Sequence, residues 1–332
     1  MKKKEILPFE DQPYSLMFHH TAFAMGMIQA NAREDITPWL CGKYINWSLH
    51  RQDPYYFSIV QDERGLEERI LLTQRQELFP KTYRAIFGDI IEELKRAISL
   101  GNYPYGSYNE EFIPGKVHYQ KRYYSHNYLL IGYDDSEQAF VSVGYLEDHR
   151  FQRYRIAYED MRRALETLQS PKIVSELYRF NPDAKFELNL PRVTRELSNY
   201  LASVPTLGGD FDWGLSVYEK LTAFFDSLGN DGKPLDIRQT RGIMEHKFFI
   251  KMRVEYLLKQ GYLCDEAALA RAEEVYREAE RTHLLALKYN LTGRVSLISG
   301  INDALHRMCE AERDYLPGVL DALEACKGGE RV

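Results

Sequence analysis

Cysteine is scarce in this 332-residue chain, and the few cysteines are far apart. They stand at Cys41, Cys264, Cys309 and Cys326, and no two of them form a C-x-x-C pair. Four scattered cysteines are too few for a disulfide framework in a chain of this length, and cysteine-based zinc sites need closely spaced pairs. The sequence therefore predicts reduced thiols and no metal.

An excess of positive charge and a long apolar run are also missing. The chain has 43 Lys and Arg residues against 49 Asp and Glu residues, a net charge of −6. No global positive field therefore favours nucleic acid or an anionic membrane as a partner. The opening MKKK is followed by EILPFEDQP and not by an apolar segment, and no run of about 18 apolar residues occurs. We expect no secretory signal, no spanning helix and a cytoplasmic location.

Several motifs that hold phosphates, metals or activated serines are absent. The sequence contains no G-x-x-x-x-G-K-[ST], no G-x-G-x-x-G after a strand, no H-E-x-x-H and no G-x-S-x-G. Nucleotide binding, zinc peptidase chemistry and an α/β-hydrolase nucleophile therefore lack support. No cofactor is predicted.

The residues that are present predict a folded protein of two parts. Hydrophobic residues make up 44% of the chain, enough for a sizeable core. Residues 1–170 mix a buried helix over 15–30, a hairpin within 55–75 and an amphipathic helix over 82–101. A second hairpin and a short helix from 158 complete an α+β pattern with an antiparallel sheet.

The rest of the chain reads as a connecting segment and a helical bundle. Residues 171–210 are polar and interrupted by proline, with one strand expected over 184–190. Residues 211–332 contain four amphipathic helical segments with short loops between them, which predicts a C-terminal helical bundle.

The stretch SHNYLLIGYDD (125–135) contains the most informative histidine. It predicts a strand with His126 at its start, a turn at Asp134 and Asp135, and a returning strand over 139–145. A histidine in this place is either a structural polar cap or a base. A papain-like site needs such a histidine after a buried helix whose N-terminus holds a thiol, followed by a strand whose side chain orients the imidazole. The helix over 15–30 precedes His126 in that order.

Three segments carry a resemblance to a known family. MFHHTAFAMGM, FIPGKVHYQKRYYSHNYLLIGYDD and RIAYEDMRRAL resemble the N-terminal domain of the butirosin biosynthesis protein H family. WGLSVYEKL and DIRQTRGIMEHKFFIKMRVEYL resemble the helical tail of many such proteins encoded beside peptide-synthetase genes. The family is related to papain-like and bacteriocin-leader peptidases, and its name-giving member moves an acyl group from a carrier-protein thioester to an amine. The resemblance implies a papain-like fold and a role in bacterial antibiotic or modified-peptide biosynthesis.

The family's catalytic triad is only partly present. His126 matches the family's histidine, whereas Met17 stands at the best match for the nucleophilic cysteine and Gly144 at the place of the acid. Ser15 is an alternative nucleophile, although a serine before a helix is more often an N-cap. Cys41 lies beyond the helix and is more readily a buried small residue or a loop thiol than a nucleophile.

Other side chains are candidates for substrate or partner binding. His19 and His20 lie on the first helix, where one of them is expected to face the cleft, and His20, Tyr124 and Trp39 are predicted to contact substrate. Core packing is the other interpretation of these aromatic residues. Five arginines between 150 and 163 form a basic cluster that suits an acidic carrier protein, or that is a solvated face paired with nearby acids.

Three hypotheses follow for function. The first is an acyltransferase-type enzyme that takes an acyl group from an acyl or peptidyl carrier protein and gives it to a small-molecule or peptide amine. The second is a catalytically degenerate binding module of the same fold that holds a carrier-bound or peptide substrate. The third is a peptidase, which the missing thiol disfavours. Whether the chain is an enzyme stays open at this point, because two of three triad positions are replaced.

Overall fold

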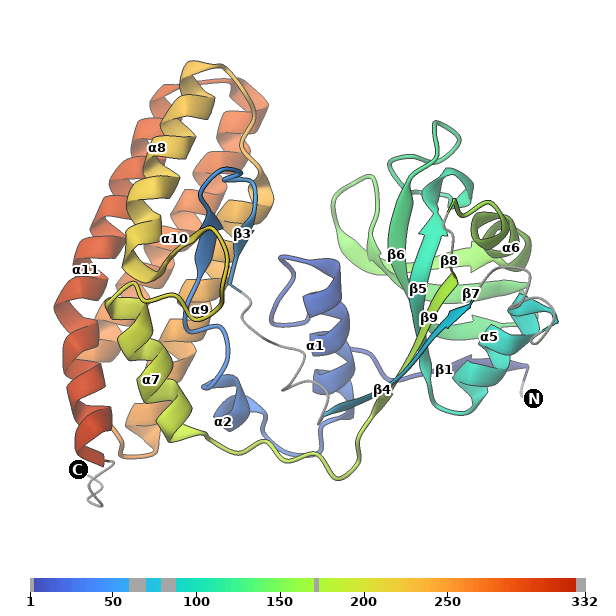
Figure 1. Ribbon diagram of the computed structural model, residues 1–332, viewed down its shortest axis with the longest axis horizontal. Coiled ribbons are helices and arrows are strands. Elements are labelled where there is room, and N and C mark those ends of the chain that lie inside the picture. Colours follow the sequence, from blue (N-terminus) through green and yellow to red (C-terminus); the bar gives the residue numbers. More distant parts are fainter. Residues whose placement is uncertain (1–2, 60–69, 79–87, 170–172, 327–332) are drawn as a thin grey trace. The chain divides into compact units, whose positions relative to one another are not determined.

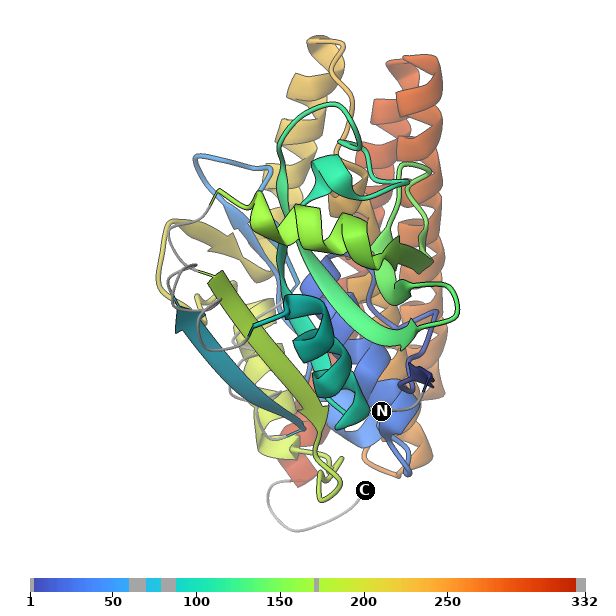
Figure 2. The same ribbon diagram turned by 90° about the vertical axis from the view of Figure 1, so that its right-hand side faces the viewer.

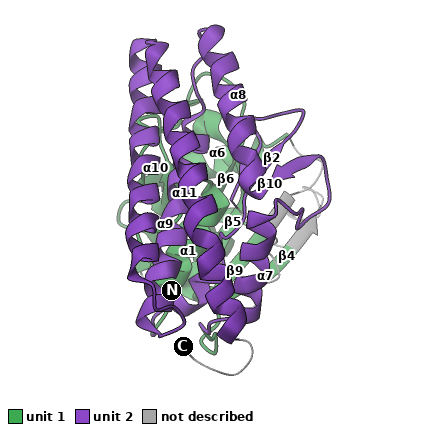
Figure 3. Cartoon of the chain, turned by 90° about the vertical axis from the view of Figure 1, so that its left-hand side faces the viewer, with its two compact units in different colours: residues 1–33, 64–185 green, residues 34–63, 186–332 purple. Residues whose placement is uncertain are grey.

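The computed structural model describes residues 3–59, 70–78, 88–169 and 173–326. The chain forms two compact units, one of residues 1–33 and 64–185 and one of residues 34–63 and 186–332 (Figure 3). The division of the chain at 170 and 210 stays a prediction about domains. The compact units follow a different division, in which the segment 34–63 joins the C-terminal helices.

The first unit contains a seven-stranded antiparallel sheet. Its main strand order is β4-β9-β5-β6-β7-β8, and β1 pairs with the second half of β6. The strands are β1 (Lys4–Ile6), β4 (Leu71–Leu78), β5 (Tyr103–Asn109), β6 (Ser125–Asp134), β7 (Ala139–Tyr145), β8 (Phe151–Ala157) and β9 (Ile173–Phe180). The predicted α+β class and antiparallel sheet are confirmed, and so is the hairpin of β6 and β7.

Helices cover both faces of this sheet. Figures 1 and 2 show α1 (His19–Asn31) on one face and α5 (Ile90–Ser99) with α6 (Tyr158–Glu166) on the other. In α1, eight consecutive residues from Thr21 to Ile28 are buried, as the uniformly apolar sequence predicts. α5 is amphipathic and begins where the Asp89 carboxylate accepts a hydrogen bond from the Ile91 amide at 2.9 Å. The first part of the helix predicted over 82–101 lies outside the described residues.

Four strands of the sheet, β1, β5, β8 and β9, were not predicted. β5 lies in a passage rich in Tyr, Pro and Gly to which no element was assigned, and β9 lies in the segment predicted to be a polar connection. β4 pairs with β9 along its whole length, and the turn residues of the hairpin predicted within 55–75 lie outside the described residues. Pairing with distant strands, and not local propensity, makes these segments extended.

The second unit is mainly helical. It contains α2 (Thr37–Leu40), α7 (Leu190–Leu201), α8 (Val217–Asn230), α9 (Ile237–Lys259), α10 (Glu266–Thr292) and α11 (Ser296–Cys326), with a small sheet of β10 (Phe211–Trp213), β2 (Ser48–His50) and β3 (Phe57–Ser58). The predicted C-terminal helices are thus present. The strand expected over 184–190 is not, because Asn189 caps the N-terminus of α7 and Pro191 stands in its first turn. No helix in the described ranges has the length and apolarity to cross a membrane.

The segment 41–47 is attached to α9 by alternate backbone carbonyls. The Arg253 guanidinium donates to the carbonyls of Cys41 and Lys43, at 2.7 and 2.6 Å. The His246 Nε2 donates to the carbonyl of Ile45 at 2.9 Å. A carbonyl cannot donate, so His246 carries its proton on Nε2. These bonds satisfy buried carbonyls of an irregular segment, which explains why residues 34–63 belong with the helices.

Candidate functional site

The His126 imidazole and the Glu110 carboxylate form a short pair in the first unit. His126 Nδ1 lies 2.5 Å from Glu110 Oε1. The Glu110 side chain is 4% exposed, whereas the His126 side chain is 31% exposed. Because a carboxylate accepts, His126 carries a proton on Nδ1 and its Nε2 is the basic nitrogen of the neutral ring. Nε2 has no hydrogen-bond partner in the part of the chain that is described.

The register of β5 and β6 brings the two residues together. Tyr108 pairs with His126 and Asn109 with Ser125, so Glu110 follows the end of β5 beside the start of β6. The Asn109 side chain accepts from the Glu111 amide at 3.1 Å and from the Tyr124 amide at 3.2 Å. The Glu110 amide also donates to the Tyr124 carbonyl at 2.9 Å. The backbone around the carboxylate is therefore fixed from both strands.

His19 occupies the N-terminus of α1 and lies against His126. The two rings are edge-to-face with their centroids 4.5 Å apart. The Tyr145 amide donates to His19 Nε2 at 3.3 Å, so this nitrogen carries no proton. Burial first, then the nearby His126 and Lys116, lower the pKa of His19 to about 2. His19 is therefore a neutral hydrogen-bond acceptor at the N-terminus of α1.

Gly144 faces the same place from β7. It has a φ of +149°, and a Cβ added to it would lie 3.4 Å from both His19 Nε2 and Lys116 Nζ. The buried Lys116 donates to the Tyr145 carbonyl at 2.7 Å and lies 4.7 Å from the centre of the Tyr154 ring. The side-chain space that an acid at 144 would use is thus bordered by His19 and Lys116.

The structure places Ser15 and Met17 before the first helix. α1 begins at His19, and its N-cap is Phe18, which makes no side-chain capping bond, so the expectation that Ser15 caps the helix is wrong. The Ser15 hydroxyl donates to Thr21 Oγ1 at 3.4 Å, and Ser15 has no exposed surface. Met17 is also buried. No solvent path leads to the Ser15 hydroxyl in this arrangement, and the role of Ser15 as a nucleophile stays a prediction.

The three predicted substrate contacts lie in different surroundings. Tyr124 is half-exposed, with its ring edge-to-face to His126 at 5.6 Å. His20 is on α1 and its ring stacks on Phe18. Trp39 belongs to the second unit, where it packs against Phe186. Only Tyr124 is in ring contact with the candidate base among these three.

All four cysteines belong to the second unit, and the first unit has none. Burial raises the pKa of the Cys41 thiol to about 11, which disfavours the thiolate that a nucleophile needs. Within the described ranges, no group of three or more His, Cys, Asp and Glu side chains is arranged to hold a metal ion.

Most of the predicted basic cluster is paired within the unit. Arg153 binds Asp11 at 2.6 Å, Arg162 binds Asp89 at 3.0 Å, and Arg155 pairs with Glu137. The Arg163 guanidinium lies over the Phe112 ring. These contacts favour the interpretation of a solvated, internally paired face over that of a carrier-binding surface.

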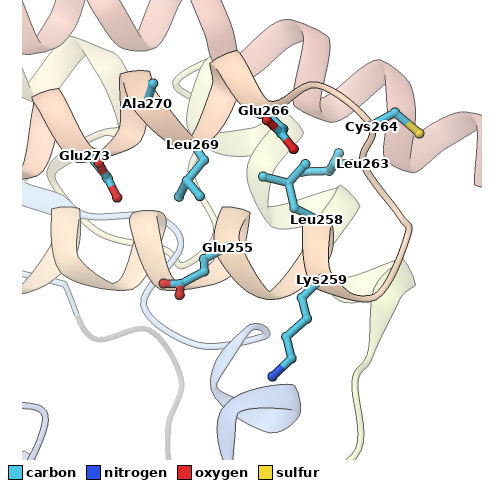
Figure 4. A pocket seen from close by; sticks show the side chains of 9 residues that line it. All are labelled: Glu255, Leu258, Lys259, Leu263, Cys264, Glu266, Leu269, Ala270 and Glu273. Carbon is cyan, nitrogen blue, oxygen red and sulfur yellow. The ribbon is translucent and has the colours of Figure 1, made fainter.

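A pocket of about 560 Å³ lies in the second unit, between the end of α9 and the start of α10. Figure 4 shows Leu258 pointing from α9 towards α10, and Leu269 and Glu273 pointing from α10 towards α9. The other charged residues that line the pocket are Glu255, Lys259 and Glu266, and Cys264 lies at one end of the pocket. The pocket has no histidine, so it offers no base of the kind found at His126.

Glu110 and Lys116 are the site residues that the sequence did not single out, whereas of His19 and His20, one of which was expected to face the cleft, His19 lies against His126. The alternation YPYGSYN just before Glu110 was the available signal, because it fits a strand that can pair with the strand of His126. No protein-family model matches this chain, and no curated protein matches it in sequence.

Proposed function

We propose that the first unit is a papain-like module similar to the butirosin biosynthesis protein H family and that it transfers an acyl group directly from a carrier-protein thioester to an amine. One observation supports this most: the partly exposed His126 side chain is oriented by a buried carboxylate, and its Nε2 has no hydrogen-bond partner among the described residues. An imidazole held in one tautomer by an acid is the usual form of a histidine base. The proposed setting is secondary-metabolite or modified-peptide biosynthesis in a bacterial cytoplasm.

Direct transfer needs a base but no nucleophile from the protein. The amine nitrogen attacks the thioester carbonyl while His126 Nε2 accepts a proton from that nitrogen. The carbon–sulfur bond then breaks, and the leaving thiolate takes the proton from His126. The products are an amide and a free carrier thiol. The Glu110 carboxylate stabilises the imidazolium that exists between the two proton transfers.

The neutral His19 supports this route over a covalent one. A covalent acyl-enzyme needs a thiol or hydroxyl beside the base, and the side chain that contacts His126 at the helix N-terminus is an imidazole. The same observation favours a second candidate function, a binding module that holds a carrier-bound or peptide substrate without turnover. A cysteine-type peptidase has less support, because the first unit contains no cysteine.

The test is amide formation from an acylated carrier protein and a panel of amines, followed by mass spectrometry. We expect His126→Ala and Glu110→Gln to lower the rate about 10²- to 10⁴-fold, the usual contribution of a positioned base. His306→Ala, which removes an exposed histidine of the second unit, should keep the full rate.

Intact-mass spectra of the protein during the reaction separate the mechanisms. Direct transfer predicts no acyl adduct on the protein. An adduct that disappears in Ser15→Ala would contradict direct transfer and establish Ser15 as the nucleophile. Binding of the acylated carrier without turnover, unchanged in His126→Ala, would establish the binding module instead.

A further inference from the structure

Arg253 is a buried cation in the second unit without an acidic partner. It lies on α9 and is 2% exposed. Two of its nitrogens donate to the backbone carbonyls of Cys41 and Lys43. No carboxylate of the described chain lies within ion-pair distance of it. A buried guanidinium that meets only neutral acceptors keeps an uncompensated positive charge, which is unfavourable in a protein interior.

One nitrogen of Arg253 and one neighbouring hydroxyl are left unpaired. Nη1 of Arg253 and the hydroxyl of Tyr315 on α11 are both buried and lack a hydrogen-bond partner in the described chain. Tyr315 is 8% exposed. Burial and then the Glu312 carboxylate raise the pKa of Tyr315, whereas the Arg253 guanidinium lowers it, so the charge of Arg253 acts on the Tyr315 hydroxyl. Buried N–H and O–H groups are nearly always paired in folded proteins, so these two orphaned buried donors need an acceptor.

Two buried acids of α9 and α11, Glu245 and Glu312, have other partners. Glu312 accepts from Lys247, Tyr200 and Tyr218. Glu245 pairs with Arg241 at 2.8 Å. Burial keeps Cys41 protonated, so its thiol does not neutralise Arg253. One negatively charged group could therefore supply both the acceptor that Arg253 and Tyr315 lack and the counter-charge of Arg253.

We propose that Arg253 and Tyr315 bind a small monovalent anion inside the helical unit. Arg253 Nη1 and the Tyr315 hydroxyl donate to it, and it compensates the guanidinium charge. A water molecule would satisfy the two donors but not the charge, which is why an anion is favoured. The site fixes α9 to α11 and, through the carbonyls of Cys41 and Lys43, to the segment that follows α2. It is independent of the function proposed for His126.

Thermal unfolding of the full chain at constant ionic strength tests this site. Sodium chloride or sodium formate replaces sodium gluconate, whose anion is too large for a packed helical core. All three tryptophans, Trp39, Trp47 and Trp213, belong to the second unit, so tryptophan fluorescence reports on that unit. We expect the midpoint to rise along a saturable curve with chloride and formate, as for any ligand that binds only the folded state. A flat response, or one that is linear and alike for every salt, overturns the proposal and indicates water or an adventitious ion only.

Tyr315→Phe gives the sharper outcome because the lost hydroxyl has no partner among the described residues. With a bound anion, this variant should have a lower midpoint than the wild type in chloride and bind the anion at least about tenfold more weakly. Without one, removing an orphaned buried hydroxyl raises the midpoint in every salt and leaves the chloride response unchanged. Tyr276→Phe, a half-exposed tyrosine on α10, is the matched control and should respond to chloride as the wild type does.

Discussion

The two units each contain an acid–base pair whose acid is buried, and the pairs differ in what surrounds the base. In the first unit Glu110 holds His126, whose side chain is 31% exposed and whose Nε2 has no partner in the described part of the chain. In the second unit Glu312 holds Lys247, and neither side chain is exposed at all.

Every donor and acceptor of the second pair is engaged. Lys247 Nζ donates to both oxygens of Glu312 at 2.9 Å and lies 3.8 Å from the centre of the Trp47 ring. Tyr200 and Tyr218 donate to the same carboxylate at 2.6 and 2.7 Å. A closed network of this kind stabilises one packing of the helices and leaves no atom for a substrate. The comparison teaches that solvent access and a spare nitrogen, and not the presence of an acid–base pair, distinguish a candidate active site.

The largest effect is expected when the closed pair is broken. Glu312→Gln leaves the Lys247 ammonium buried without its counter-charge, which typically destabilises a protein by about 3–5 kcal/mol. Urea unfolding followed by tryptophan fluorescence measures this for the second unit. Glu310→Gln, an exposed position on the same helix, is the control and should change stability by less than about 0.5 kcal/mol. An equally small effect for Glu312→Gln would mean that the pair is not closed as described.

A thiol introduced at the N-terminus of α1 tests whether the surroundings of His126 can activate a nucleophile. His19→Cys places a cysteine at the start of α1, beside the His126 ring and Lys116. A helix N-terminus and neighbouring cations lower a thiol pKa from about 8.5 into the range of about 3.5–7.5. The rate of alkylation by iodoacetamide between pH 5 and 9, with peptide mapping, measures it. Cys264, which is exposed in the second unit, is the internal reference. If the pKa of the thiol at position 19 is no lower than that of Cys264, the result would argue against a papain-like arrangement.

The effect that is smallest at neutral pH concerns acid stability. The folded-state pKa of His19 is about 2, below the value of about 6.5 in an unfolded chain, so the unfolded state binds a proton that the folded state refuses. The part of the free energy of unfolding that depends on a neutral His19 is fully present above about pH 6.5. It is lost as the pH falls towards 2, with a slope of at most about 1.4 kcal/mol per pH unit. His19→Gln keeps an acceptor for the Tyr145 amide and should flatten this part of the profile, measured by tyrosine circular dichroism. Identical acid profiles for variant and wild type would show that His19 is not held neutral.

The sequence identified His126 because both strands of its hairpin have clear local signals. Glu110 was missed because its place depends on the register between β5 and β6, and a strand with Pro104 and Gly106 does not look like one locally. His19 was expected on the helix but not at its start, because Ser15 is the stronger capping residue by type. Ser15 is instead buried, where its hydroxyl binds Thr21.

Long-range contacts also explain why the division of the chain into its two units could not be predicted from the sequence. The segment 34–63 joins the helical unit through Arg253 and His246, which follow it by about 200 residues. Neither composition nor periodicity records a bond of that kind. The helices themselves were predictable, because α8, α9, α10 and α11 each show an apolar face in sequence.

The protonation of individual histidine rings tests the central claim most directly. Nitrogen-15 NMR of the histidine side chains at neutral pH, with His126→Gln and His246→Gln for assignment, distinguishes the two ring nitrogens. The structure predicts opposite tautomers in the two units: His126 with its proton on Nδ1, held by Glu110, and His246 with its proton on Nε2, held by the Ile45 carbonyl. A His126 that carries its proton on Nε2 and not on Nδ1 would contradict the assignment of this ring as an oriented base.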